Sequence, residues 1–92
     1  MEALYSIIED IVSSLPKEFT THELILNLAK NNQHAYIKAL HEHLDSERPF
    51  QLLHSKIGKH LSKSTDLVRL KGDKVDEDIF GQQSENAKWE VI

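Results

Sequence analysis

The sequence contains no cysteine among its 92 residues. Disulfide bonds, thiolate nucleophiles and cysteine zinc sites are therefore excluded, and the composition fits a reducing compartment. No apolar run approaches the roughly 20 residues that a membrane span needs. The first residues include Glu2, Glu9 and Asp10, where a signal peptide carries positive charge. We therefore expect a cytoplasmic protein that does not contact a membrane.

Basic residues are also in deficit, because 11 Lys and Arg stand against 15 Asp and Glu, for a net charge of −4. This balance argues against non-specific adhesion of the whole molecule to nucleic acid. The charge is unevenly distributed along the chain. Positive residues concentrate between 48 and 74, namely Arg48, Lys56, Lys59, Lys63, Arg69, Lys71 and Lys74. A local basic surface is therefore compatible with the acidic total.

Hydrophobic residues make up 39% of the chain, which is enough for one modest core, so we expect a single domain over residues 1–92. Apolar residues recur at helical spacing and predict helices over about 3–15, 21–31, 34–44 and 49–63. In the third of these helices the apolar face is expected to consist of Tyr36, Ile37, Leu40 and Leu44.

Local signals mark two of the helix starts. Thr20 and Glu23 have the spacing of a capping box, in which each side chain accepts a hydrogen bond from the other residue's backbone amide. Pro49 suits the first turn of the helix over 49–63, because its missing amide has no partner there in any case. Gly58 lies inside that helix and costs about 1 kcal/mol relative to alanine, which indicates either close packing or a weaker helix.

After Ser64 the spacing of apolar residues changes from 3.6 to 2, which predicts strands over about 67–71 and 87–92. The polar and acidic residues 72–86 between them are predicted to form the tip of a hairpin. This stretch is long for a connection without regular structure. Either it is an extended tip, or it contains a third short strand around Ile79 and Phe80.

The order of these elements, with a basic helix directly before a terminal hairpin of the type Asp-Leu-Val-Arg-Leu, tip, Lys-Trp-Glu-Val-Ile, resembles the winged helix-turn-helix superfamily. The resemblance covers nearly the whole chain, from about Ala3 to Ile92. It implies a mainly α fold with a C-terminal β-hairpin, in which three to four helices precede the wing. It also implies binding of double-stranded DNA, with the recognition helix in the major groove and the wing on the backbone.

The helix over 49–63 carries polar side chains opposite its apolar stripe of Phe50, Leu53, Ile57 and Leu61. Lysine and serine side chains suit phosphates, and Gln51 is the one candidate for bidentate contact with a base. The predicted nucleic-acid-binding residues are Gln51, Ser55, Lys56, Lys59, Ser62 and Lys63, with Arg69, Lys71 and Lys74 at the base of the wing as backbone contacts. A solvated helix whose lysines only keep the domain soluble is the alternative explanation.

The acidic tip favours a second interpretation, because its carboxylates repel phosphate. They are Asp73, Asp76, Glu77, Asp78 and Glu85. The sequence therefore leaves two functions open. One is a non-catalytic DNA-binding module with a role in transcription regulation. The other is a protein-interaction module of the same fold that docks through its acidic wing or the face of its first helix. Leu26 and Leu52 lie off the main apolar stripes and suit a contact between two copies of the chain.

Six histidines raise the question of a metal site. His41 and His43 are two residues apart and point about 200° apart on a helix, whereas helical metal ligands are spaced by three or four. We therefore expect no metal and no cofactor, and we expect His54 and His60 to be hydrogen-bonded and partly buried beside the core. No nucleophile, phosphate loop or paired carboxylate indicates an enzyme. Trp89 is expected to cover the hairpin side of the core.

Overall fold

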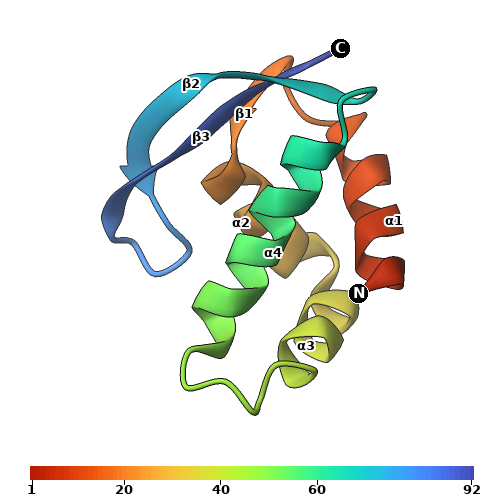
Figure 1. Ribbon diagram of the computed structural model, residues 1–92, viewed down its shortest axis with the longest axis vertical. Coiled ribbons are helices and arrows are strands. Elements are labelled where there is room, and N and C mark those ends of the chain that lie inside the picture. The colour runs from red at the N-terminus through yellow and green to blue at the C-terminus, as the bar shows by residue number, and fades with distance from the viewer.

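The computed structural model describes residues 1–92 as four helices and a three-stranded antiparallel sheet (Figure 1). The elements follow in the order α1 (Glu2–Val12), β1 (Glu18–Thr20), α2 (Thr21–Asn31), α3 (Gln33–His41), α4 (Pro49–Lys63), β2 (Val68–Glu77) and β3 (Gln83–Val91). None of the helices has the length and apolar character that a membrane crossing requires.

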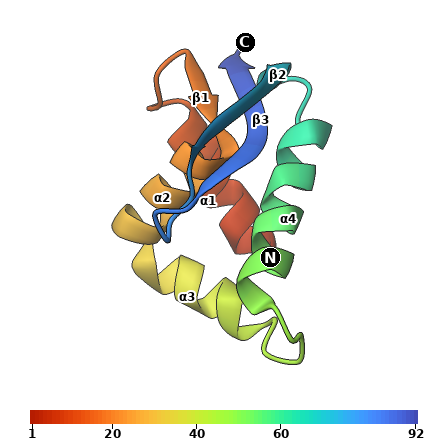
Figure 2. The same cartoon turned by 90° about the vertical axis from the view of Figure 1, so that its left-hand side faces the viewer.

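The sheet has the strand order β1-β3-β2, so that the last strand lies in the middle. The strand β1 pairs with β3 around Phe19 and Trp89, and β2 pairs with β3 as a long hairpin. The register shifts between Leu70 and Gly72, and Gly72 has a φ of 138°, a conformation that side chains other than glycine rarely adopt. Figures 1 and 2 show the hairpin as a curved ribbon whose turn comes near α2 and α4.

The core consists of apolar side chains from all four helices and from the sheet. In α4 the stripe of Leu53, Ile57 and Leu61 is at most 1% exposed, as the helical spacing predicts. Trp89 lies on the hairpin side of this core and is 5% exposed. Its indole Nε1 donates a hydrogen bond to Oγ1 of Thr21 at 2.9 Å, so that its one polar atom is satisfied. The expectation for Trp89 is confirmed.

The capping box at the start of α2 is also confirmed. The backbone amide of Glu23 donates to Oγ1 of Thr20 at 3.1 Å, and the amide of Thr20 donates to Oε1 of Glu23 at 3.0 Å. Pro49 occupies the first turn of α4, again as predicted. These two signals fix where α2 and α4 begin.

The hairpin is longer than the sequence pattern predicts. The strands expected over 67–71 and 87–92 continue to Glu77 and start again at Gln83, so that the connection expected over 72–86 shrinks to 78–82. Most residues that pair in this extension are polar, with Val75 and Ala87 as the exceptions, so it lacks the alternation that marks a strand. Of the two alternatives left open for this stretch, a third short strand around Ile79 and Phe80 is wrong, because both residues lie in the turn.

Two predicted helices end earlier than expected. The helix predicted over 3–15 ends at Val12, and the one predicted over 34–44 runs from Gln33 to His41. In α3 the inward face consists of Tyr36 and Ala39, which are 5% and 3% exposed. Ile37 and Leu44, predicted to be buried, are 63% and 60% exposed. Tyr36 and Ala39 are three positions apart and share one helical face, whereas Ile37 projects from another face and Leu44 lies beyond the end of the helix.

Candidate nucleic-acid interface

The exposed part of α4 separates two hollows in the surface. On the hairpin side lies a groove of about 640 Å³, which Gln51, Ser55, Gly58 and Ser62 border from α4. On the α1 side lies a smaller hollow of about 360 Å³, which Lys56, His60 and Lys63 border from α4. Lys59 borders both and therefore stands on the ridge between them. The structure thus divides the predicted binding residues of this helix between two sides of one ridge.

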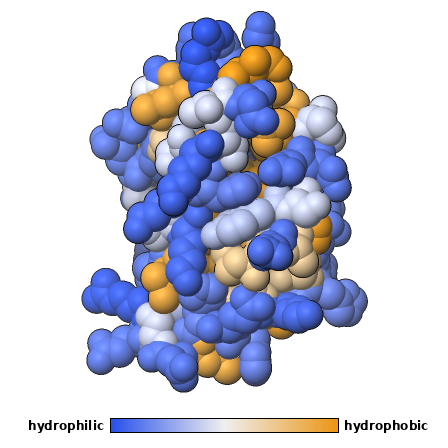
Figure 3. Space-filling view, turned by 45° about the vertical axis from the view of Figure 1, so that its right-hand side comes forward, coloured by the Kyte–Doolittle hydropathy of each residue, from blue (hydrophilic) through white to orange (hydrophobic).

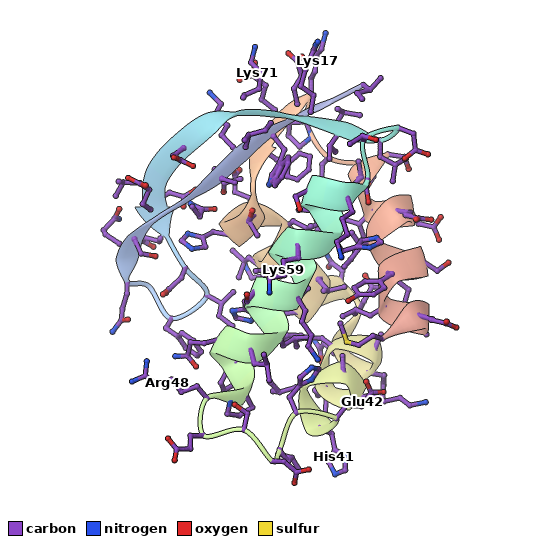
Figure 4. All side chains as sticks on the ribbon, viewed as in Figure 1. Lys17, His41, Glu42, Arg48, Lys59 and Lys71 are labelled. Atoms are coloured by element: carbon purple, nitrogen blue, oxygen red, sulfur yellow. The ribbon has the colours of Figure 1, made fainter.

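The three lysines of α4 have no acidic partner. None of the ion pairs of the chain includes Lys56, Lys59 or Lys63, and α4 contains neither Asp nor Glu. Figure 4 shows Lys59 midway along the uncovered face of α4, and hydrophilic residues dominate the side of the molecule that carries α1 and α4 (Figure 3). The charges of Lys56, Lys59 and Lys63 are therefore available to an external anion.

Arg69 and Lys71 are placed differently. Both form ion pairs with the carboxylate of Glu90 on the neighbouring strand β3, Lys71 at 3.7 Å. The hydrogen bond from Arg69 is the main cause that lowers the pKa of Glu90. Figure 4 shows Lys71 and Lys17 at the same end of the molecule, away from Lys59. These two cations therefore do not join the lysines of α4. Lys74 is exposed on β2 and has no ion pair.

The uncharged candidates on α4 are accessible. Gln51 and Ser55 are exposed, and Ser62 is exposed with its hydroxyl donating to the carbonyl of Lys59 at 2.7 Å. The turn of the hairpin reaches the start of the same helix, since the rings of Phe50 and Phe80 meet edge to face with centroids 5.0 Å apart. Gln51, which follows Phe50, therefore lies close to the turn of the hairpin.

Part of the acidic hairpin has a structural role that the sequence did not reveal. Asp76 accepts hydrogen bonds from Oγ1 of Thr20 and Nδ2 of Asn86, both at 2.7 Å, and its Oδ1 lies 2.7 Å from Nδ1 of His22. Burial raises the pKa of this carboxyl, but the hydrogen bonds from Thr20, His22 and Asn86 outweigh burial and lower it. The partners come from distant parts of the sequence, so no local signal could have found them.

The two histidines of α4, His54 and His60, differ in their hydrogen bonding. Nε2 of His54 lies 2.6 Å from the hydroxyl of Tyr36. Burial lowers the pKa of His54 to about 4 and raises the pKa of Tyr36 to about 12, so both groups are neutral at pH 7. His60 stacks on the ring of Tyr5 at 4.1 Å, but its enclosed Nε2 has no hydrogen-bond partner. Both are partly buried as predicted, whereas the predicted hydrogen bonding is wrong for His60.

The other histidines and the two leucines expected off the apolar stripes have the following positions. His43 is buried, with Nδ1 at 2.6 Å from the carbonyl of Ala39, and His41 is exposed. No group of three metal-ligating side chains comes together. Leu26 and Leu52 are both 39% exposed, in line with their positions off the apolar stripes.

Comparison of the chain with protein-family models, with curated proteins and with solved structures found no match. The functional interpretation therefore depends on the geometry of the chain's own residues.

Proposed function

We propose that the chain is a non-catalytic winged-helix module that binds double-stranded DNA through the uncovered side of α4. The proposal is supported by the order of elements, in which helices are followed by one long hairpin and the most basic helix comes directly before it. In this arrangement α4 is the recognition helix and the β2–β3 hairpin is the wing.

The observation that carries the proposal is the set of three unpaired lysines on a helix without acidic residues. An α-helix with its side chains is about 10–12 Å wide and fits the major groove, which is about 12 Å wide. From Lys56 to Lys63 the charges extend over about 10 Å of the helix axis at 1.5 Å per residue. They can therefore contact more than one phosphate along the edge of the groove.

The side chains divide by chemistry. Lys56, Lys59 and Lys63 neutralise phosphates, and the hydroxyls of Ser55 and Ser62 add hydrogen bonds to the backbone. The amide of Gln51 is the one group able to contact a base with two hydrogen bonds. Affinity in this scheme comes mainly from phosphate contacts, so we expect only modest sequence specificity. Arg69 and Lys71 lie outside the proposed surface. Lys71 stands at another end of the molecule from Lys59, and Arg69 shares with it the single carboxylate of Glu90, which offsets one of their two charges.

A charge-reversal experiment tests the proposal. The double variant Lys56→Glu, Lys59→Glu is titrated against a fluorescein-labelled 30-base-pair duplex, with fluorescence anisotropy as the measurement. We expect the duplex to bind the unmodified chain and to show no binding to the variant, while the circular dichroism spectra of the two agree. Absence of binding to the unmodified chain at low salt overturns the proposal.

The matched control is Lys30→Glu, Lys38→Glu, which makes the same change in net charge on α2 and α3. Both lysines are exposed and without ion pairs. If the proposal is correct, this variant keeps most of the affinity. An equal loss in both double variants means that net charge alone is responsible and that α4 has no special role.

A further inference from the structure

The groove between α4 and the hairpin differs in chemistry from the basic ridge of α4, because apolar side chains form part of its lining. Its volume of about 640 Å³ lies within the range of ligand sites, roughly 300–1,000 Å³. The lining includes three aromatic rings and several aliphatic side chains, contributed by α2, α4 and the hairpin. The aromatic residues are Phe50, Phe80 and Trp89. This lining provides an apolar floor next to the ridge of α4.

Two large apolar residues on the rim of the groove remain in contact with water. Leu70 on β2 is 58% exposed and Phe80 in the turn is 55% exposed. Both border the groove, together with the better buried Ile25 and Trp89. Exposed apolar groups beside a concave apolar surface are typical of sites where another molecule binds. Binding of an apolar group here removes these two side chains from water, so the groove favours an apolar occupant.

Acidic groups on the hairpin wall restrict the charge of the occupant. Asp73 and Asp78 border the groove. The side chain of Asp73 has no hydrogen bond or ion pair within the chain, whereas Oδ1 of Asp78 accepts from the amides of Phe80 and Gln82. The opposite wall contributes Lys59 as its only lysine. Burial keeps His54 neutral, because it lowers its pKa to about 4.

These charges oppose a phosphate chain on the hairpin side of the groove and favour a cation there. Carboxylates beside aromatic rings attract ammonium and guanidinium groups, because a ring face and a carboxylate both present negative charge. We propose that the groove binds a short basic amphipathic segment of a partner protein. Its apolar side chains contact Leu70 and Phe80, and one Lys or Arg pairs with Asp73. The groove shares Gln51, Ser55, Lys59 and Ser62 with the DNA surface proposed for α4, whereas the contacts proposed here lie on the hairpin.

The only tryptophan of the chain provides a local reporter, since Trp89 borders the groove. The probe is a 14-residue peptide of leucine and lysine with the spacing of an amphipathic helix and without aromatic residues. A second peptide replaces each lysine with glutamate. We expect the lysine peptide to change the emission of Trp89 in a saturable manner, and the glutamate peptide to leave the emission unchanged.

Two variants locate the charge contact. Asp73→Asn is expected to weaken binding of the lysine peptide roughly fivefold, which is about the effect of one partly exposed ion pair. Glu85→Gln removes an exposed carboxylate of the same hairpin that does not border the groove, and it should leave the affinity unchanged. Phe80→Ser should weaken binding through loss of apolar contact. Circular dichroism establishes that each variant is folded.

Several outcomes contradict the proposal. Equal responses to the two peptides show that the groove does not select a cation. Equal losses in Asp73→Asn and Glu85→Gln show that only the net charge matters. Emission that changes with protein concentration alone, together with dimers in sedimentation velocity, shows that a second copy of the chain occupies the groove. Binding of the lysine peptide with no change at Trp89 places it elsewhere on the surface.

Discussion

Nδ1 of His22 and Oδ1 of Asp76 lie 2.7 Å apart and join the first turn of α2 to the far half of the hairpin. The same carboxylate accepts from Thr20 and Asn86, and Oδ1 of Asn86 accepts from the backbone amide of His22 at 2.8 Å. Strand β2 extends well beyond the core, with most of its residues exposed. Polar contacts therefore hold this half of the hairpin against α2, where the apolar core does not reach.

The variant Asp76→Asn is expected to lower the free energy of unfolding by roughly 1–2 kcal/mol, because an ionised acceptor with several donors is replaced by a neutral amide. The measurement is urea denaturation at pH 7. Asp73→Asn is the control, since Asp73 is exposed on the same strand and its carboxylate accepts no hydrogen bond within the chain. Equal unfolding midpoints for the two variants contradict a role of Asp76 in holding the hairpin.

Only some features of the fold have local signals in the sequence. Capping of α2 by Thr20 and Glu23 depends on residues three apart, and the buried stripe of α4 repeats along one helix, so both were predicted correctly. The outer half of the hairpin contains mostly polar residues on both strands. Its pairing depends on the turn at Asp78 and on the contacts of Asp76, neither of which produces a periodic pattern.

The sequence predicted only those parts of the candidate site that depend on local spacing. Helical spacing is enough to place Lys59 and Lys63 on the exposed side of α4, while Lys56 is half-buried toward α1, and no ion pair includes any of the three. The partner of Arg69 and Lys71 lies about twenty positions away on the neighbouring strand, as Glu90. Strand register decides that contact, and the register could not be derived from a hairpin whose predicted strands were too short.

Gly58 offers a test of packing in α4. A Cβ atom built at this position meets nothing within 4 Å, so close packing does not require glycine there. Alanine favours the helix by roughly 1 kcal/mol relative to glycine, and we expect Gly58→Ala to raise the free energy of unfolding by roughly 0.5–1 kcal/mol. Urea denaturation is the measurement. A destabilised variant contradicts the open space seen beside Gly58.

The stability of the chain should depend on pH through His54. Burial and, second, the charge of His22 lower its pKa to about 4 in the folded chain, against about 6.5 when unfolded. Between these values the unfolded state binds more protons than the folded state, so the free energy of unfolding falls as the pH is lowered from about 6.5 to about 4. The full shift corresponds to at most about 3 kcal/mol, and partial exposure of the ring reduces this to roughly 1–2 kcal/mol.

Urea midpoints at pH 7 and pH 4.5 measure this effect. The variant His54→Gln keeps an acceptor for the hydroxyl of Tyr36 but does not titrate, so its stability should change less over the same interval. An equal change in both proteins assigns the pH dependence to other groups.

The salt dependence of duplex binding reports how many phosphates the chain contacts. Each phosphate contact releases counterions, and the slope of log affinity against log salt is about −0.9 per contact. Three lysines on α4, with Lys74 as a fourth unpaired cation on the hairpin, predict a slope of roughly −3 to −4 for the unmodified chain. Lys63→Ala should make the slope less negative by about 1, whereas Lys71→Ala should leave it unchanged because Lys71 lies beside Glu90 at another end of the molecule from Lys59. A slope near zero, or equal effects of the two alanine variants, is incompatible with binding through α4.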